Sequence, residues 1–164
     1  MQKKKLEILI TNDDGYHSKG FKTAIEIFSK YGNVTAIAPR DSQSGKSASL
    51  TMDVPLWLKK INEKTASNGN SIRIYSFTGA PVDCIKMAMN KFFDLKHLPD
   101  LLISGINHGS NASVAAVYSG TLGATKEGTI YGIPSIGLSI NTHDTNANFA
   151  PVKKYIGVII KNFF

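Results

Sequence analysis

The sequence has little cysteine and no long apolar run, and both shortages exclude whole classes of protein. Cys84 is the one cysteine among 164 residues, so no disulfide can form within the chain. A lone thiol suits a reducing compartment, and we expect a cytoplasmic protein. No apolar run is long enough to cross a membrane, and the apolar stretch after the basic residues 1–5 is too short for a signal peptide and contains Glu7. We therefore expect no membrane partner.

Acidic residues are also few. The chain has 12 Asp and Glu residues and 19 Lys and Arg residues, which gives a formal net charge of +7. The lysines are scattered, and the sequence contains no arginine-rich stripe with interleaved aromatic residues. This pattern is typical of solvated lysines, so we expect no nucleic-acid partner. Hydrophobic residues make up 42% of the chain, which excludes a disordered protein and predicts one domain over residues 1–164.

The first forty residues read as strand, helix and strand. Apolar residues run together at 6–11, recur at helical spacing at 21–28 and run together again at 34–38. Two strands joined by such a helix pair in parallel through a right-handed crossover. The sequence therefore predicts an α/β protein with a mostly parallel sheet.

The rest of the chain continues this alternation. Alternating patterns at 50–61 and 71–77, separated by a polar turn, predict an antiparallel β-hairpin that projects from the sheet. Residues 105–119 are polar and are expected to form a long loop. Other patterns predict strands at 100–104 and 133–140, and helices that start at Pro81 and span 120–131 and 152–163. The last helix stops without a cap on "KNFF", so we expect the natural chain to be longer.

Three polar segments follow predicted parallel strands, "TNDDG", "APRDSQSGKS" and "SGINHGSN". The carboxyl ends of parallel strands lie along one edge of a sheet, where ligands bind in open α/β folds. Asp13 and Asp14 repel each other at this edge, and a hard divalent cation would offset that repulsion. Ser44 and Asn107 could complete the coordination shell with neutral oxygens. Because His, Asp and Glu do not cluster at ligand spacing, zinc is less favoured than Mg²⁺ or Mn²⁺.

Each of these features also has a purely structural interpretation. Asp-Asp-Gly after a strand forms turns and helix caps, and Ser44-Gly45 suits a turn. Asn107 could satisfy backbone groups of its own loop, and His17 and His108 could be ordinary loop residues. The sequence leaves these alternatives open.

The segment "TGAPVDC", residues 78–84, gives a weaker signal. Thr78 and Asp83 could contact a substrate. Pro81, however, suits the first turn of a helix, and a helix start explains much of the pattern.

Ser119-Gly120-Thr121 stands at the start of a predicted helix. Free N–H groups, two hydroxyls and the positive end of the helix dipole would suit a phosphate, although Ser119 could equally be an ordinary N-cap. Gly120 and Gly123 are poor helix formers, so they imply a close approach by a ligand or by a packed neighbour. We expect Gly120→Val to weaken phosphate binding and to leave the metal shell unchanged.

Five stretches, "ITNDDGYHSKG", "APRDSQSGKSASLT", "GAPVDC", "DLLISGINHGSN" and "YSGTLGATKEG", together resemble the motifs of the SurE survival protein family of 5′/3′-nucleotidases, in the family's order. The resemblance covers the chain to about Ile140. It implies a Rossmann-like three-layer core and a metal-dependent phosphatase that hydrolyses nucleoside 5′- and 3′-monophosphates and, in some members, short polyphosphate. It also implies a homodimer or homotetramer, and a C-terminal part of the family fold that this chain lacks. A nucleotide- or phosphate-binding module without turnover is the alternative.

Carried over to this sequence, the resemblance implies one divalent cation, Mg²⁺ or Mn²⁺, and a set of site residues. The implied catalytic residues are Asp13 and Asp14, and which of them acts as the base stays open. The implied metal ligands are Asp13, Asp14, Ser44 and Asn107. The implied substrate-binding residues are Asn12, Gly45, Asn111, Ser119, Gly120 and Thr121.

Overall fold

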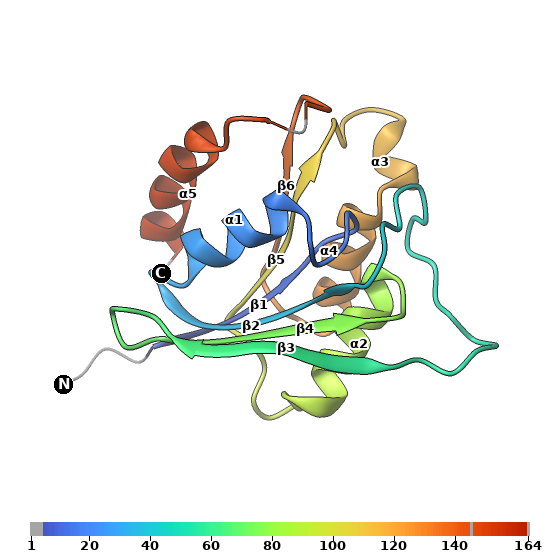
Figure 1. Cartoon of the computed structure of the whole chain (residues 1–164), viewed down its shortest axis with the longest axis horizontal. Coiled ribbons are helices and arrows are strands. Elements are labelled where there is room, and N and C mark those ends of the chain that lie inside the picture. Colours follow the sequence, from blue (N-terminus) through green and yellow to red (C-terminus); the bar gives the residue numbers. More distant parts are fainter. Residues whose placement is uncertain (1–4, 145, 164) are drawn as a thin grey trace.

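The computed structural model describes residues 5–144 and 146–163, so residues 1–4 of the basic N-terminal stretch lie outside the described residues. Helices and strands alternate along the chain, apart from one run of three successive strands and one pair of successive helices (Figure 1). Among the described residues, no helix combines the length and the apolar character needed to cross a membrane. The elements are β1 Leu6–Thr11, α1 Lys19–Phe28, β2 Gly32–Pro39, β3 Leu58–Thr65, β4 Ser71–Phe77, α2 Pro81–Lys91, β5 Leu101–His108, α3 Ala115–Tyr118, α4 Gly120–Ile130, β6 Ser135–Ile140 and α5 Ala150–Phe163.

The strands form one six-stranded sheet in the order β3-β4-β2-β1-β5-β6. Every neighbouring pair is parallel except β3 and β4, which form an antiparallel hairpin at one edge. The predicted α/β class with a mostly parallel sheet is confirmed. The order also makes β2, β1 and β5 direct neighbours in the middle of the sheet.

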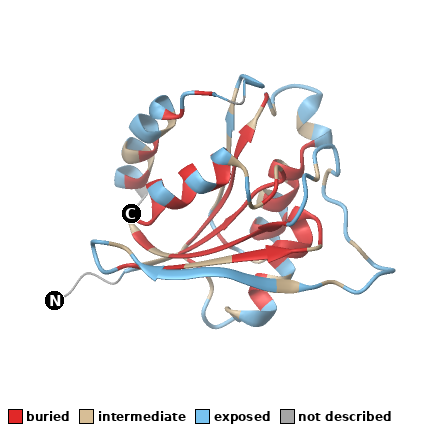
Figure 2. Cartoon of the chain, in the orientation of Figure 1, coloured by how far each residue is buried: buried red, intermediate tan, exposed pale blue. Residues whose placement is uncertain are grey.

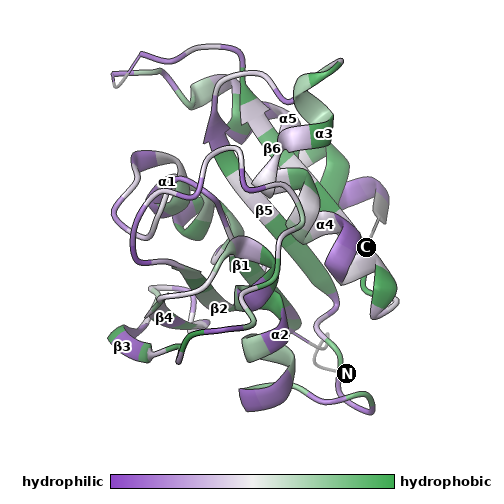
Figure 3. Ribbon diagram, turned by 90° about the vertical axis from the view of Figure 1, so that its right-hand side faces the viewer, coloured by the Kyte–Doolittle hydropathy of each residue, from purple (hydrophilic) through white to green (hydrophobic). Residues whose placement is uncertain are grey.

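Helices cover both faces of the sheet. Ile8 and Ile10 of β1 pack in one cluster with α1 and α5, whereas Leu9 packs in a second cluster with α2 and α4 on the other face. All three side chains are fully buried, which explains why β1 reads as an unbroken apolar run. Figure 2 shows buried residues concentrated on the central strands and on the inner sides of the helices. Figure 3 shows hydrophobic residues along β5.

The strand predicted at 50–61 starts only at Leu58 and runs to Thr65, so residues 40–57 form a long connection without a strand. β3 is a mostly exposed edge strand that carries Lys and Glu side chains. Antiparallel pairing with β4 holds it in place, rather than burial of an apolar face. The apolar pattern of the sequence therefore does not predict where β3 begins and ends.

β5 is longer than predicted. The loop expected at 105–119 begins with four more strand residues and contains the short helix α3. β5 lies between β1 and β6, and its end aligns Asn107 with Ser139 and His108 with Ile140. These partners on a neighbouring strand override the weak strand preference of Gly and Asn.

Candidate active site

The polar segments that follow β1, β2 and β5 begin at one edge of the sheet, as predicted, because these strands are parallel neighbours. Two hydrogen bonds join the segments there. The Gln43 N–H donates to the backbone oxygen of Asp13 at 2.7 Å, and the His108 N–H donates to Asp14 Oδ2 at 3.2 Å. Ser44 and Asn107, which adjoin these two donors in the sequence, therefore belong to the same region of the edge.

Asp13 is buried, with 3% of its surface exposed, and it faces the first turn of α4. The Thr121 hydroxyl donates to Asp13 Oδ1 at 2.7 Å. Burial raises the pKa of the Asp13 carboxyl above its ordinary value, the bond from Thr121 opposes this rise, and the charge of Asp14 adds to it. A carboxylate in this setting gains strongly from a nearby cation, because the charge interaction is little screened by water.

Asp14 is tied to β5 instead. Its side chain is 17% exposed, and the ring Nδ1 of His108 lies 3.5 Å from the Oδ2 atom that accepts the His108 N–H. The His108 ring packs edge-on against Phe149, with 5.4 Å between the centroids, and its buried Nε2 has no hydrogen-bond partner among the described residues. The sequence leaves the role of His108 open and does not predict this contact. Its place directly after Asn107 in the motif was the available signal.

Asn107 and Ser44 differ in how firmly they are held. Asn107 is buried near the end of β5, and its Nδ2 donates to the Gly109 oxygen at 2.9 Å, which leaves Oδ1 as the atom suited to a cation. Ser44 is exposed, and its hydroxyl lies 3.2 Å from that of Ser42. The structure thus fixes Asn107 by strand pairing and leaves Ser44 on an open turn.

The donor chemistry of this region fits a hard divalent cation. Asp13 and Asp14 offer carboxylate oxygens, and Ser44 and Asn107 offer neutral oxygens. Over residues 5–144 and 146–163, no group of three or more His, Cys, Asp and Glu side chains is placed to hold a metal ion. Two carboxylates with neutral oxygens are typical of Mg²⁺ and Mn²⁺ sites rather than of zinc sites.

The start of α4 is directed at Asp13. The Ser119 hydroxyl accepts the Leu122 N–H at 3.1 Å, so Ser119 is an N-cap, the structural alternative that the sequence left open. Thr121 is fully buried and its hydroxyl is engaged with Asp13. The positive end of the α4 dipole therefore lies beside the buried carboxylate, and the two hydroxyls expected to face a phosphate both have partners within the chain.

Two glycines of α4 are explained by packed neighbours. A Cβ at Gly120 would lie 2.9 Å from Asp13 Cβ and 3.1 Å from its Oδ2. A Cβ at Gly123 would lie 2.5 Å from the backbone oxygen of Ser47. The expectation that Gly120→Val leaves the metal shell unchanged is wrong, because the new side chain would push against a predicted ligand.

The three remaining predicted substrate residues lie in the segments that follow β1, β2 and β5. Asn12 is fully buried, and its Nδ2 donates to the Gly15 oxygen at 3.0 Å and to the Ser18 hydroxyl at 2.8 Å. Its side chain shapes the turn and does not reach the surface. Asn111 donates to the Ser139 hydroxyl at 2.7 Å and so joins its segment to β6. Gly45 lies on the exposed turn with φ near +78° and has open space beside its Cα.

The segment "TGAPVDC" serves the fold. Pro81 begins α2, as predicted, and Asp83 accepts the Ala80 N–H at 2.8 Å as part of the helix cap. The Thr78 hydroxyl accepts the Trp57 N–H at 2.8 Å. Both predicted substrate contacts, Thr78 and Asp83, are thus engaged with backbone groups of the chain.

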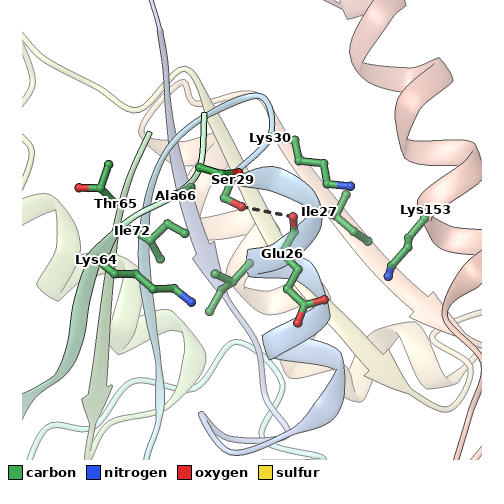
Figure 4. A pocket seen from close by; sticks show the side chains of 11 residues that line it. Glu26, Ile27, Ser29, Lys30, Lys64, Thr65, Ala66, Ile72 and Lys153 are labelled. Carbon is green, nitrogen blue, oxygen red and sulfur yellow. Dashed lines mark hydrogen bonds between the residues drawn. The ribbon is translucent and has the colours of Figure 1, made fainter. Parts of the chain in front are cut away.

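A separate cavity of about 490 Å³ lies between the end of α1, the end of β3 and the start of β4. Figure 4 shows Lys30, Lys64 and Lys153 around it together with Glu26. This is the amino edge of the parallel strands, and α1 presents the negative end of its dipole there. Ligands of open α/β sheets bind at the other edge, so this cavity is not the candidate active site.

Comparison with known proteins identifies the family of this chain. The family described as Survival protein SurE matches residues 8–164. The 5′-nucleotidase SurE of Christiangramia forsetii is 41% identical over 162 residues, which cover 99% of this chain and 60% of that protein. The 5′-nucleotidase SurE of Flavobacterium psychrophilum is 43% identical over 149 residues, which cover 91% of this chain and 56% of that protein.

The crystal structure of the SurE protein from Aquifex aeolicus is similar with a TM-score of 0.78 and 35% identity, over 94% of this chain and 58% of that chain. The chain therefore spans somewhat over half the length of these relatives. The match along nearly the whole chain, in sequence and in fold, shows that it belongs to the SurE survival protein family.

Proposed function

We propose that this chain forms the catalytic core of a metal-dependent phosphomonoesterase, which converts a nucleoside 5′- or 3′-monophosphate into nucleoside and phosphate. The observation that carries the proposal is the pair Asp13 and Asp14 at the carboxyl edge of the sheet, one buried against α4 and the other tied to β5. Support also comes from the relatives, which are named 5′-nucleotidases.

The residues at this edge divide the work of the proposed reaction. A Mg²⁺ or Mn²⁺ ion held by Asp13, Asp14, Ser44 and Asn107 would polarise a phosphoryl oxygen and lower the pKa of a water molecule. Asp13 keeps its orientation through Thr121. Asp14 is the better candidate base, because it is partly exposed, whereas Asp13 is buried and its Oδ1 accepts the Thr121 hydroxyl. The N–H groups at the start of α4 would favour the negative charge of the phosphate.

The same segments could bind a nucleotide without hydrolysing it, and this binding module is the second candidate. This candidate is kept because the chain spans only 60% and 56% of the length of two similar 5′-nucleotidases. Self-association into a homodimer or homotetramer is also part of the proposal. Its support is a set of large apolar side chains that are exposed on residues 40–57 and on or beside α3, and sedimentation velocity would test it. These side chains are Leu50, Met52, Val54, Trp57, Val114, Val117 and Tyr118.

The test is phosphate release from adenosine 5′- and 3′-monophosphate with Mn²⁺, with Mg²⁺ and with a chelator. We expect phosphate release to depend on the metal. Short polyphosphate is tested in the same assay as a further substrate. Tight nucleotide binding without release would favour the binding module. Equal release with the chelator would contradict the role of the metal.

A further inference from the structure

Residues 40–57, the connection from β2 to β3, reach the candidate site with little packing to hold them. Most of their side chains are exposed, among them Leu50 at 47%, Met52 at 81% and Trp57 at 65%. Figure 2 shows this connection as a largely exposed stretch on one side of the molecule. A segment with so few buried apolar contacts opens easily, so its position depends on its hydrogen bonds.

Those hydrogen bonds come at intervals along the connection. The Gln43 N–H donates to the Asp13 oxygen, and the Ser47 N–H and hydroxyl donate to the oxygens of Tyr118 at 3.1 Å and Val117 at 2.8 Å. These bonds use neutral backbone acceptors. Ser47 also lies flush against α4, since its backbone oxygen occupies the space beside Gly123.

The next anchor is different, because its acceptor is a buried carboxylate. Asp83 is 6% exposed, and it accepts the Thr51 hydroxyl at 2.7 Å and the Thr51 N–H at 3.2 Å. The same carboxylate accepts the Ala80 N–H at the start of α2. Hydrogen bonds to a charged acceptor are stronger than those to a neutral one, so Thr51 is the firmest point of the connection.

We propose that Asp83 is a positioning residue of the candidate site, which acts through Thr51 to hold residues 40–57 and thereby Ser44 beside Asp13. The inference rests on the proposed function, because Ser44 matters only if the site binds a cation. Asp83 itself touches neither substrate nor metal. It ties the connection to α2, a helix that packs on the central strands, so the exposed turn at Ser44 takes its position from the core.

Asp83 both accepts hydrogen bonds from Thr51 and caps α2. The test changes Thr51 and leaves Asp83 in place, so that the helix cap is unaffected. Thr51→Val removes the hydroxyl donor at nearly constant volume, and Thr51→Ser restores it. Thr129→Val is the matched control, because its hydroxyl bonds to Thr125 within the exposed end of α4, far from the connection. The readouts are Mn²⁺ affinity by calorimetry, kcat and KM for adenosine 5′-monophosphate, and hydrogen exchange of the amides at 43–51.

We expect Thr51→Val to speed exchange at 43–51 and to weaken Mn²⁺ binding by about two- to tenfold, the range for the loss of one hydrogen bond. Thr51→Ser should restore both, and Thr129→Val should change neither. Faster exchange with unchanged Mn²⁺ affinity and kcat/KM would overturn the inference, as would unchanged exchange. If the unmodified chain binds no Mn²⁺ and releases no phosphate, the proposed function itself has failed, and the positioning role with it.

Discussion

The residues after β1 and the residues after β2 both reach the candidate site, but they are held there in different ways. Residues 12–18 form a short, packed turn in which Asn12 is fully buried and donates two hydrogen bonds to the turn. Residues 40–57 form a long and mostly exposed connection. The first segment is fixed by burial, and the second is fixed by a few hydrogen bonds.

The difference follows from where the two strands lead. β1 lies in the middle of the sheet with helices on both faces, so the turn that leaves it starts inside the core. The connection after β2 must travel to β3 at the edge of the sheet, where little covers it. We expect Asp13 and Asp14 to set the place of the site, and Ser44 to reach it only while the hydrogen bonds of the connection hold.

The largest expected effect comes from a carboxylate of the packed turn. Asp14→Asn should lower kcat/KM by about a hundredfold or more, since outer partners of metal ligands alone account for about 10–100-fold. The fold should persist, because the side chain keeps its size. Asp53→Asn makes the same charge change at an exposed position of the long connection and should have little effect. Steady-state kinetics measure both, and unaltered turnover of Asp14→Asn at saturating Mn²⁺ would remove Asp14 from the site.

Two alanine substitutions in α4 compare the rigidity of the two segments directly. Gly120→Ala presses on Asp13 at 2.9 Å, and Gly123→Ala presses on the Ser47 oxygen at 2.5 Å. We expect Gly120→Ala to cost about 1–3 kcal/mol of unfolding free energy and to weaken Mn²⁺ binding, because the packed turn cannot move aside.

Gly123→Ala also forces backbone atoms of the connection to shift, but we expect it to cost less than Gly120→Ala, because most of that connection is exposed and alanine favours the helix. Urea unfolding measures both variants. The closer contact is at Gly123. A larger loss of unfolding free energy for Gly123→Ala than for Gly120→Ala would show that the connection is as rigid as the packed turn, and would contradict the difference between the two segments.

The smallest effect concerns stability without metal. Burial holds the pKa of Asp13 above its ordinary value, so the folded chain binds this proton more tightly than the unfolded chain does. This contribution to stability is present at low pH and is lost as the pH rises through the raised pKa. Asp13→Asn should therefore raise the Tm of the metal-free chain at neutral pH, because asparagine is uncharged and its burial carries no such penalty.

The difference in Tm between Asp13→Asn and the unmodified chain should shrink as the pH falls, because the carboxyl becomes neutral too. Calorimetry across pH with a chelator present measures this difference. A variant that is less stable than the unmodified chain at neutral pH would show that burial of the Asp13 carboxylate carries no penalty. The negative charge of Asp13 would then stabilise the packed turn.

The sequence by itself determined the features that neighbouring residues encode. The apolar run of β1, the Asp-Asp-Gly turn after it and the helix start at Pro81 all depend on a few consecutive residues, and each was predicted where it lies. The same local patterns predicted a parallel sheet, and a parallel sheet brings the carboxyl ends of β1, β2 and β5 to one edge.

Only the tertiary structure decided which distant residues meet. Thr121 reaches Asp13 across 108 positions of sequence, and Thr51 reaches Asp83 across 32. The sheet order fixes such contacts, and no short pattern carries that order. For the same reason the local pattern predicts β3 too early and predicts a loop at the end of β5. Pairing with a neighbouring strand, rather than local preference, makes both segments strands.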